Sequence, residues 1–280
     1  MGVVNVTPDS FSDGGLYLDT DKAVARAREL LNEGADIIDV GGESTRPGAT
    51  VAESASEATV SRVPVSEEEE IGRVTPVIRA LKRLQPHAII SIDTYKSAVA
   101  REAVKAGAQI VNDISGFRWD ARMAKTVAEM KVGAVLMHTR GRPDEWRSLP
   151  PVGDPVLLVK RELREWAEAA VLAGIKRDHL VVDPGFGFGK RFEENYPLLA
   201  RFGDFQQLGF PLLAGTSRKS FIGRMLAREG KDAPVDQRLF GTLATEVALI
   251  LKGAHIIRTH EVRATVEAAR AADAVVATGG

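Results

Sequence analysis

The chain has 280 residues and a formal net charge of −1, from 37 Lys and Arg against 38 Asp and Glu. This balance argues against a nucleic-acid partner, and 44% apolar residues exclude disorder throughout. The chain has no cysteine, which excludes disulfides and thiolate chemistry. It also has no apolar run of membrane-spanning length and no signal peptide, so we expect a cytoplasmic protein without a membrane partner.

Short apolar runs alternate with amphipathic segments along the chain, which favours a parallel sheet with helical crossovers. The predicted strands cover residues 3–6, 36–40, 88–93, 109–113, 134–138, 179–183, 211–214 and 254–258. The predicted helices cover residues 20–32, 67–84, 96–106, 121–131, 155–173, 194–202, 220–229, 237–252 and 261–272. Repetition of this unit predicts an α/β fold, a single-domain (β/α)8 TIM barrel over residues 1–280. A doubly wound open sheet is the alternative.

One segment departs from the alternation. Residues 49–66 are mostly small and polar, and their apolar positions have no clear period. A connection of this length inside a barrel is usually functional or disordered. We therefore predict an extended loop at about 49–66.

Each predicted strand ends in a glycine or in a polar or ionisable residue. Because the carboxyl ends of the strands of a barrel meet at one mouth, these residues predict a composite active site there. Asp93, Asn112 and Asp183 provide two carboxylates and an amide, which suit a planar heterocycle with several N–H donors. A helix cap for Asp93 and a turn for Asp183 are the structural alternatives.

Three cationic or ionisable side chains, Lys219, Arg258 and His260, follow the last two strands, where barrels often bind phosphate. Surface ion pairs are the alternative for Lys219 and Arg258. His138 ends the fifth strand, and lining the site or a structural role are the two alternatives for it.

A glycine-rich segment follows the sixth strand and reads Gly185-x-Gly187-x-Gly189-Lys190. It resembles a phosphate-binding loop but does not match the Walker A pattern. A Walker A loop needs glycine at position 184 and Ser or Thr at 191, and the chain has Pro184 and Arg191. We predict a tight turn beside a flat ligand instead.

Seven ordered motifs resemble those of the dihydropteroate synthases, a family of the folate pathway. They span residues 5–15, 39–48, 91–94, 112–116, 183–190, 217–220 and 258–261, and include Asn-Val-Thr-Pro-Asp-Ser-Phe-Ser-Asp-Gly-Gly and Asp-Pro-Gly-Phe-Gly-Phe-Gly-Lys. The resemblance runs from Asn5 to about Ala272. The segment near residues 50–64 is longer than the corresponding loop of the family.

The resemblance implies a reaction in which 4-aminobenzoate displaces pyrophosphate from (7,8-dihydropterin-6-yl)methyl diphosphate. It implies three catalytic residues: Asp13, Asp93 and Lys219. It implies pterin contacts from Asp93, Asn112, Met137, Asp183, Phe188 and Lys219. It implies diphosphate contacts from Asn5, Thr45, Arg258 and His260. It implies aminobenzoate contacts from Phe11, Thr45, Arg46, Pro47, Phe188 and Ser220.

The resemblance also implies Mg²⁺ as the cofactor, held at Asn5, and a homodimer. An SN1-like path is plausible because an electron-rich pterin can stabilise a cationic methylene. We expect the apolar positions Leu249, Ile250 and Val266 of the last two helices to supply the dimer interface. A non-catalytic pterin-binding paralogue and a methyltetrahydrofolate corrinoid methyltransferase are the alternative functions.

Overall fold

Six parallel strands form one continuous sheet in chain order, and two more form a separate parallel pair. The strands are β1 (Gly2–Asn5), β2 (Ile37–Gly41), β3 (Ile89–Asp93), β4 (Ile110–Asp113), β5 (Gly133–Met137), β6 (Leu180–Asp183), β7 (Leu213–Ala214) and β8 (Ile256–Ile257). The computed structural model describes residues 1–7, 16–43 and 65–278.

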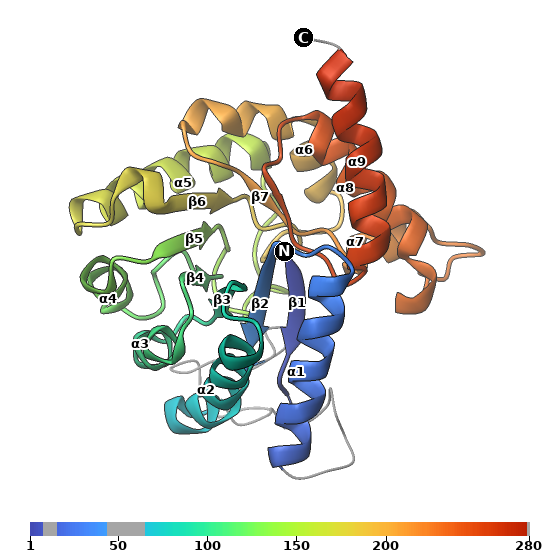
Figure 1. The fold of residues 1–280 in the computed structure, drawn as a ribbon. Helices are drawn as coiled ribbons and strands as arrows, with labels where there is room; N and C mark the ends of the chain where they lie inside the picture. Colours follow the sequence, from blue (N-terminus) through green and yellow to red (C-terminus); the bar gives the residue numbers. More distant parts are fainter. Residues whose placement is uncertain (8–15, 44–64, 279–280) are drawn as a thin grey trace.

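Two parallel bridges join the sheet and the pair into a ring. Val182 of β6 pairs with Leu212, and Gly2 of β1 pairs with Thr259 after β8. Backbone bonds accompany both bridges, from Val182 N to Pro211 O at 3.0 Å and from Val3 N to Thr259 O at 3.1 Å. The predicted (β/α)8 barrel is confirmed, and helices surround the strands on the outside (Figure 1).

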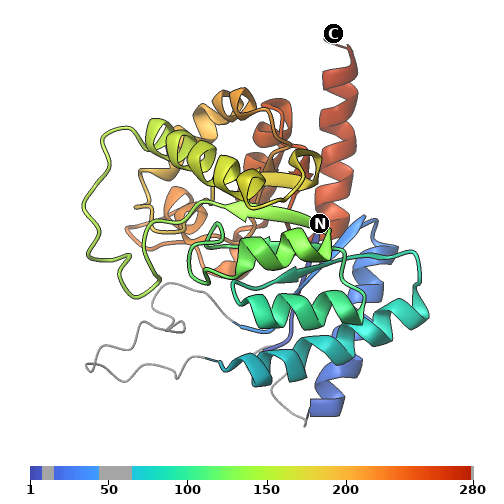
Figure 2. The ribbon, with the colours of Figure 1, turned by 90° about the vertical axis from the view of Figure 1, so that its left-hand side faces the viewer.

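The helices follow the predicted order. They are α1 (Leu16–Asn32), α2 (Glu67–Leu84), α3 (Ser97–Ala106), α4 (Met123–Met130), α5 (Pro155–Leu172), α6 (Asn195–Ala200), α7 (Ser220–Met225), α8 (Leu239–Leu251) and α9 (Val262–Thr278). Three short 3-10 helices add η2 (Arg177–His179), η3 (Phe202–Leu208) and η4 (Val235–Gln237). Helices α2, α3 and α4 lie side by side along one flank of the barrel (Figure 2).

Local signals explain where the best-predicted helices begin. Ser66 accepts a bond from Glu69 N at 3.1 Å, and four glutamates occupy the first turn of α2, where the helix dipole favours negative charge. Asp154 caps α5 in the same way, with Pro155 in the first turn.

The predicted boundaries differ most around the last two strands. Pro211 lacks an N–H donor, so β7 begins only at Leu213. Helix α7 ends at Met225 rather than at residue 229, because Glu229 and Gly230 both adopt positive φ and reverse the chain between Arg228 and Lys231.

The interior of the barrel has an apolar floor and a polar mouth. The floor cluster consists of Met1, Val135 and Leu213, with Ile37, Ile110, Val181 and Ile256 packed against it. Side chains two residues apart on a strand point to the same face. Asp39, Asn112, Met137, Asp183 and Arg258 each lie two residues after a member of this cluster, and the strands therefore aim them into the mouth.

Candidate active site

The strand register brings the predicted site residues into one row around the mouth. Asn5 pairs with Gly41, Gly41 with Asp93, and Asp93 with Asn112. Across the ring, Met137 pairs with Asp183. The predicted site residues of five different strands therefore converge at one end of the barrel.

Arg258, which directly follows β8, connects two carboxylates at the mouth. Its Nε lies 2.7 Å from Oδ2 of Asp39, and its Nη2 lies 2.6 Å from Oδ2 of Asp93. Asn112 also donates to Oδ2 of Asp39, at 3.1 Å. Arg258 therefore contacts Asp93 directly, because the closed ring places the end of the eighth strand next to the first strand and within side-chain reach of the second and third.

Burial and neighbouring charges shift the pKa of two groups of this cluster, Asp93 and Arg258. Burial raises the pKa of Asp93 to about 7, although Arg258 acts in the opposite direction. Burial alone would lower the pKa of Arg258, but Asp39 and Asp93 raise it instead, so the guanidinium stays charged. Such strongly perturbed groups at a barrel mouth are typical of functional sites.

A second cluster is built on the glycine-rich segment after β6. Asp183 is buried, and its Oδ1 accepts from Gly185 N at 2.7 Å. Burial raises the pKa of Asp183. The same effect lowers the pKa of Lys219 to about 7, with Asp183 opposing the shift. Lys219 Nζ lies 3.9 Å from the centre of the Phe188 ring, so the ammonium rests on an aromatic face.

Two further predicted residues lie near Lys219. Ser220 is the first residue of α7 and is exposed. His260 Nδ1 is 2.9 Å from Ser217 Oγ, and Ser217 Oγ also donates to Glu261 at 3.1 Å. Ser217 thus fixes the ring of His260 at the rim of the mouth.

Sequence reasoning missed two side chains at this site. Asp39 is fully buried within β2, and an acid inside an otherwise apolar strand is the signal that would have identified it. Trp146 lies in the β5–α5 connection, and its ring packs edge to face on Phe188 with centroids 5.3 Å apart. No sequence signal marked Trp146.

His138 does not belong to the mouth. Its ring stacks on Trp166 of α5 at 5.1 Å, and its Nε2 lies 3.0 Å from Glu162 of the same helix. Burial lowers the pKa of His138 to about 3, so it is a neutral packing residue.

Five predicted site residues lie outside the described part of the chain. They are Phe11, Asp13, Thr45, Arg46 and Pro47. Most of the predicted extended loop at 49–66 also falls there, and residues 65 and 66 lead directly into α2.

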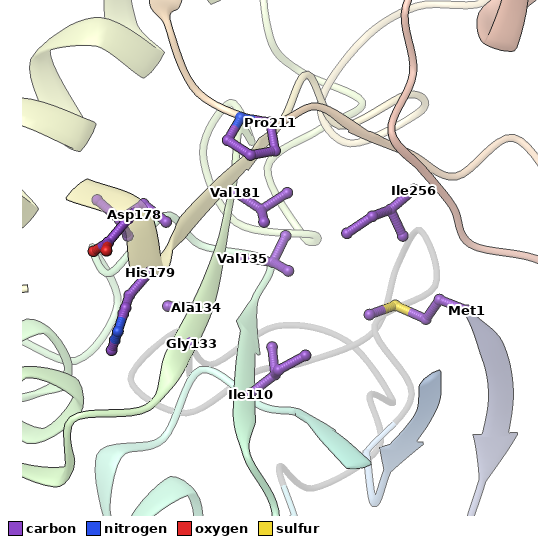
Figure 3. Close-up of a pocket in the computed structure, with 11 residues that line it drawn as sticks. Met1, Ile110, Gly133, Ala134, Val135, Asp178, His179, Val181, Pro211 and Ile256 are labelled. Atoms are coloured by element: carbon purple, nitrogen blue, oxygen red, sulfur yellow. The ribbon is translucent and has the colours of Figure 1, made fainter. Parts of the chain in front are cut away.

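An apolar cavity of about 240 Å³ lies at the opposite end of the barrel (Figure 3). Met1, Ile110, Val135, Val181 and Ile256 line it and belong to the floor cluster. It holds none of the charged mouth residues, so we do not assign the chemistry to it.

Within residues 1–7, 16–43 and 65–278, no group of three or more His, Asp or Glu side chains is arranged to hold a metal ion by itself. No helix in those same ranges has the length and apolar character needed to cross a membrane.

Comparisons with known proteins agree with this geometry. The family model for pterin binding enzymes matches residues 1–260. The dihydropteroate synthase of Clostridium beijerinckii is 44% identical over 99% of this chain and 93% of its own length. That of Bacillus subtilis is 44% identical over 100% of this chain and 89% of its own.

Solved structures agree as well. A Xanthomonas albilineans dihydropteroate synthase with 4-aminobenzoic acid is 43% identical, covers 99% of this chain and 92% of its own, and superposes with a TM-score of 0.86. A Yersinia pestis dihydropteroate synthase with a sulfonamide drug complex is 39% identical, with coverages of 99% and 93% and a TM-score of 0.86.

Proposed function

This chain belongs to the pterin-binding enzyme family, among its dihydropteroate synthases, and from that premise we propose how its residues perform the reaction. The substrates are (7,8-dihydropterin-6-yl)methyl diphosphate and 4-aminobenzoate, and the products are 7,8-dihydropteroate and pyrophosphate. The observation that carries this proposal is the acceptor set Asp93, Asn112 and Asp183 around one mouth, with Met137 beside Asp183 on the neighbouring strand.

The pterin binds across this acceptor set. A 2-amino-4-oxo ring presents N–H donors on one edge, and the carboxylate of Asp183 can accept two of them. Asn112 can both donate and accept, and Met137 and Phe188 contact the ring faces. Lys219 serves the polar edge of the ring, supported by its position beside Asp183 and Phe188.

The diphosphate binds on the side of Arg258, His260, Asn5 and Thr45. A guanidinium carries five N–H donors, and the bonds to Asp39 and Asp93 use two of them. The remaining donors suit phosphate oxygens.

A Mg²⁺ ion fits this site when the substrate supplies most of its ligands. The described residues hold no carboxylate and histidine cluster for a metal, but Asn5 ends β1 at the mouth with an amide oxygen. Mg²⁺ is commonly bound by one or two protein oxygens together with substrate phosphates. We assign Asn5 as its protein ligand, and the ion, when bound, neutralises diphosphate charge.

The chemistry needs no nucleophilic side chain. The C–O bond to the diphosphate breaks first, and its electron pair leaves with pyrophosphate. The amine nitrogen then bonds to the methylene carbon, and its proton passes to water. Arg258 stabilises the charge that develops on the leaving group. Asp93, together with Asp13, offsets positive charge on the methylene.

The aminobenzoate binds beside Phe188 and Ser220, with Phe11, Thr45, Arg46 and Pro47 completing its site. We infer that residues 1–280 form one domain. We also infer that its extended loop at 49–66 lies beside the aminobenzoate site and affects the binding of this substrate and of sulfonamides that resemble it. Deletion of residues 52–61 is expected to raise the KM for aminobenzoate and to change sulfonamide inhibition. Unchanged values for both would contradict this role.

One assay tests the function itself. The purified protein, Mg²⁺ and both substrates are expected to release pyrophosphate and form dihydropteroate in equal amounts. Pterin binding without either product would favour a non-catalytic pterin-binding protein. Methyl transfer from methyltetrahydrofolate to a corrinoid would favour the methyltransferase. A cytoplasmic location stays a prediction of the sequence.

We also propose a homodimer, through a surface different from the one that the sequence suggested. Of the three positions that the sequence suggested, Leu249 is fully buried and not available to a partner, whereas Ile250 and Val266 are half-buried. The outer face of α8 instead exposes Phe240 (81%) and Leu251 (49%), eleven positions apart on one helix face. A second copy of this chain would cover that apolar face.

A further inference from the structure

The glycine-rich segment after β6 is organised around the side chain of Lys190 rather than around a bound phosphate. In a phosphate loop, backbone N–H groups point at the ligand and the lysine reaches its phosphates. Here Lys190 Nζ donates inward to three carbonyl oxygens, those of Gly185 at 2.7 Å, Phe188 at 3.2 Å and His138 at 3.2 Å. An ammonium has three N–H donors, so these contacts use all of them.

These carbonyls belong to two different strand ends. His138 directly follows β5, whereas Gly185 and Phe188 lie in the segment after β6. Lys190 is itself buried, with 8% exposure, so solvent cannot readily replace its bonds. One buried side chain therefore ties the glycine-rich segment to the neighbouring strand.

The backbone of this segment passes so close to the neighbouring strand end that two of its positions accept only glycine. Gly185 has φ +68°, and a Cβ there would lie 1.9 Å from His138 O. At Gly189, with φ +65°, a Cβ would lie 2.3 Å from Arg140 O. The close approach of the two strand ends thus depends on the glycines for space and on Lys190 for attraction.

The glycine-rich segment carries two of the residues proposed to bind the pterin, Asp183 and Phe188. Asp183 begins it, and the Phe188 ring contacts both Lys219 Nζ and the Trp146 ring. The carbonyl of Phe188 is one of the three that Lys190 holds. A displacement of this main chain would move the Phe188 ring relative to Asp183.

We propose that Lys190 is a positioning residue, whose ammonium fixes the main chain that presents Asp183 and Phe188 to the pterin. The proposal rests on the proposed function for the identity of the ligand. Lys190 acts through hydrogen bonds to carbonyls and does not contact substrate. Its removal leaves carbonyls inside the protein without their donor.

The test compares Lys190→Met, which keeps an unbranched apolar side chain but loses the N–H donors, with Lys252→Met at an exposed position directly after α8. We expect Lys190→Met to lower kcat/KM by about a hundredfold, since misplacement on the scale of 1 Å can cost that much. Calorimetry should show weaker binding of a pterin. Lys252→Met should match wild type in both measurements.

A rescue experiment separates positioning from a general loss of structure. In Lys190→Ala, added methylammonium should restore kcat/KM by about tenfold, which is the worth of one charge-assisted hydrogen bond. Tetramethylammonium has the same charge but no N–H donor and should restore nothing.

Wild-type kcat/KM and pterin affinity in Lys190→Met would overturn the proposal. So would a Lys190→Ala enzyme that methylammonium does not rescue, or that both cations rescue equally. A wild-type enzyme that neither binds pterin nor forms dihydropteroate would overturn the proposed function instead.

Discussion

Asp113 and Asp120 are close in the sequence, but their surroundings shift their pKa values in opposite directions. Asp113 is fully buried, and burial raises its pKa to about 7 even though Ser115 N donates to it at 2.7 Å. Burial also acts on Asp120, but bonds from Arg122 and Ser97 outweigh it and lower the pKa of that carboxyl. The two residues therefore make opposite contributions to stability as the pH changes.

The sign for Asp113 follows from linkage. An acid whose pKa is higher in the folded state costs no stability at low pH, and its cost grows as the pH rises towards the folded pKa. Asp113→Asn removes this cost and keeps the acceptor oxygen. We expect its Tm relative to wild type to rise by roughly 2–6 °C between pH 5 and pH 8, measured by calorimetry.

Asp120→Asn is the matched control. Its carboxylate is ionised at both pH values, and the stability it contributes is lost only in acid, as the pH falls through its lowered pKa. Its Tm should therefore lie below that of wild type by the same amount at pH 5 and pH 8. A parallel response of the two variants would contradict the assignment of the buried charge to Asp113.

Arg258 donates hydrogen bonds to the carboxylates of Asp39 and Asp93, and in the proposed reaction it also stabilises the leaving diphosphate. Arg258→Ala is expected to lower kcat by about 10²–10³-fold, the effect of removing one preorganised donor to a developing anion. Calorimetry with inorganic pyrophosphate should show weaker binding in the same variant. Arg263→Ala, at an exposed site on α9, serves as the control. Unchanged activity and pyrophosphate affinity in Arg258→Ala would exclude Arg258 from the diphosphate site.

At the scale of the elements, a glycine in the segment after β6 and a glycine inside α2 differ in whether they can accept a side chain. Gly185→Ala places a Cβ 1.9 Å from His138 O at a positive φ, so we expect a loss of several kcal/mol of stability and of pterin binding. Gly72→Ala lies inside α2 with nothing within 4 Å of the new Cβ, and it should stabilise the protein by about 0.5–1 kcal/mol. Urea unfolding measures both changes, and a destabilised Gly72→Ala would show that α2 tolerates no added side chain there.

The elements also explain how far the sequence alone could lead. Helix α2 was predicted at its observed bounds because Ser66 and the following glutamates are local signals. The contact between Arg258 and Asp93 joins residues 165 positions apart, and no local pattern encodes a distance across a closed ring. Asp39 did carry a local signal, as an acid inside an apolar strand, but its contact with Arg258 across the ring did not.

The same limit explains why Leu249 of α8 was expected at a dimer interface although it is buried. Its residues are apolar on nearly every side, so periodicity could not tell which face meets the barrel. Packing against α9, with smaller contacts to α6 and α7, buries Leu249 and leaves Phe240 outside. The choice of face is a property of tertiary packing rather than of the helix.

At the scale of the whole molecule, this outer face leads to the last prediction. A large aromatic side chain at 81% exposure, on a helix with a second exposed leucine on the same face, costs solubility unless a partner covers it. If α8 meets its counterpart across a two-fold axis, each Phe240 would contribute to both halves of one interface. A glutamate at position 240 would then place two like charges in an apolar contact, which strongly disfavours association.

We therefore expect Phe240→Glu to sediment as a monomer at concentrations where wild type is a dimer, with its helical circular dichroism unchanged. Leu172→Glu makes the same kind of change at a leucine with 89% exposure at the end of α5, away from α8, and should leave the dimer intact. Equal effects of the two substitutions would mean that added charge, rather than the α8 face, controls association. The pterin site lies at the strand ends, so Phe240→Glu should keep pterin affinity even as a monomer.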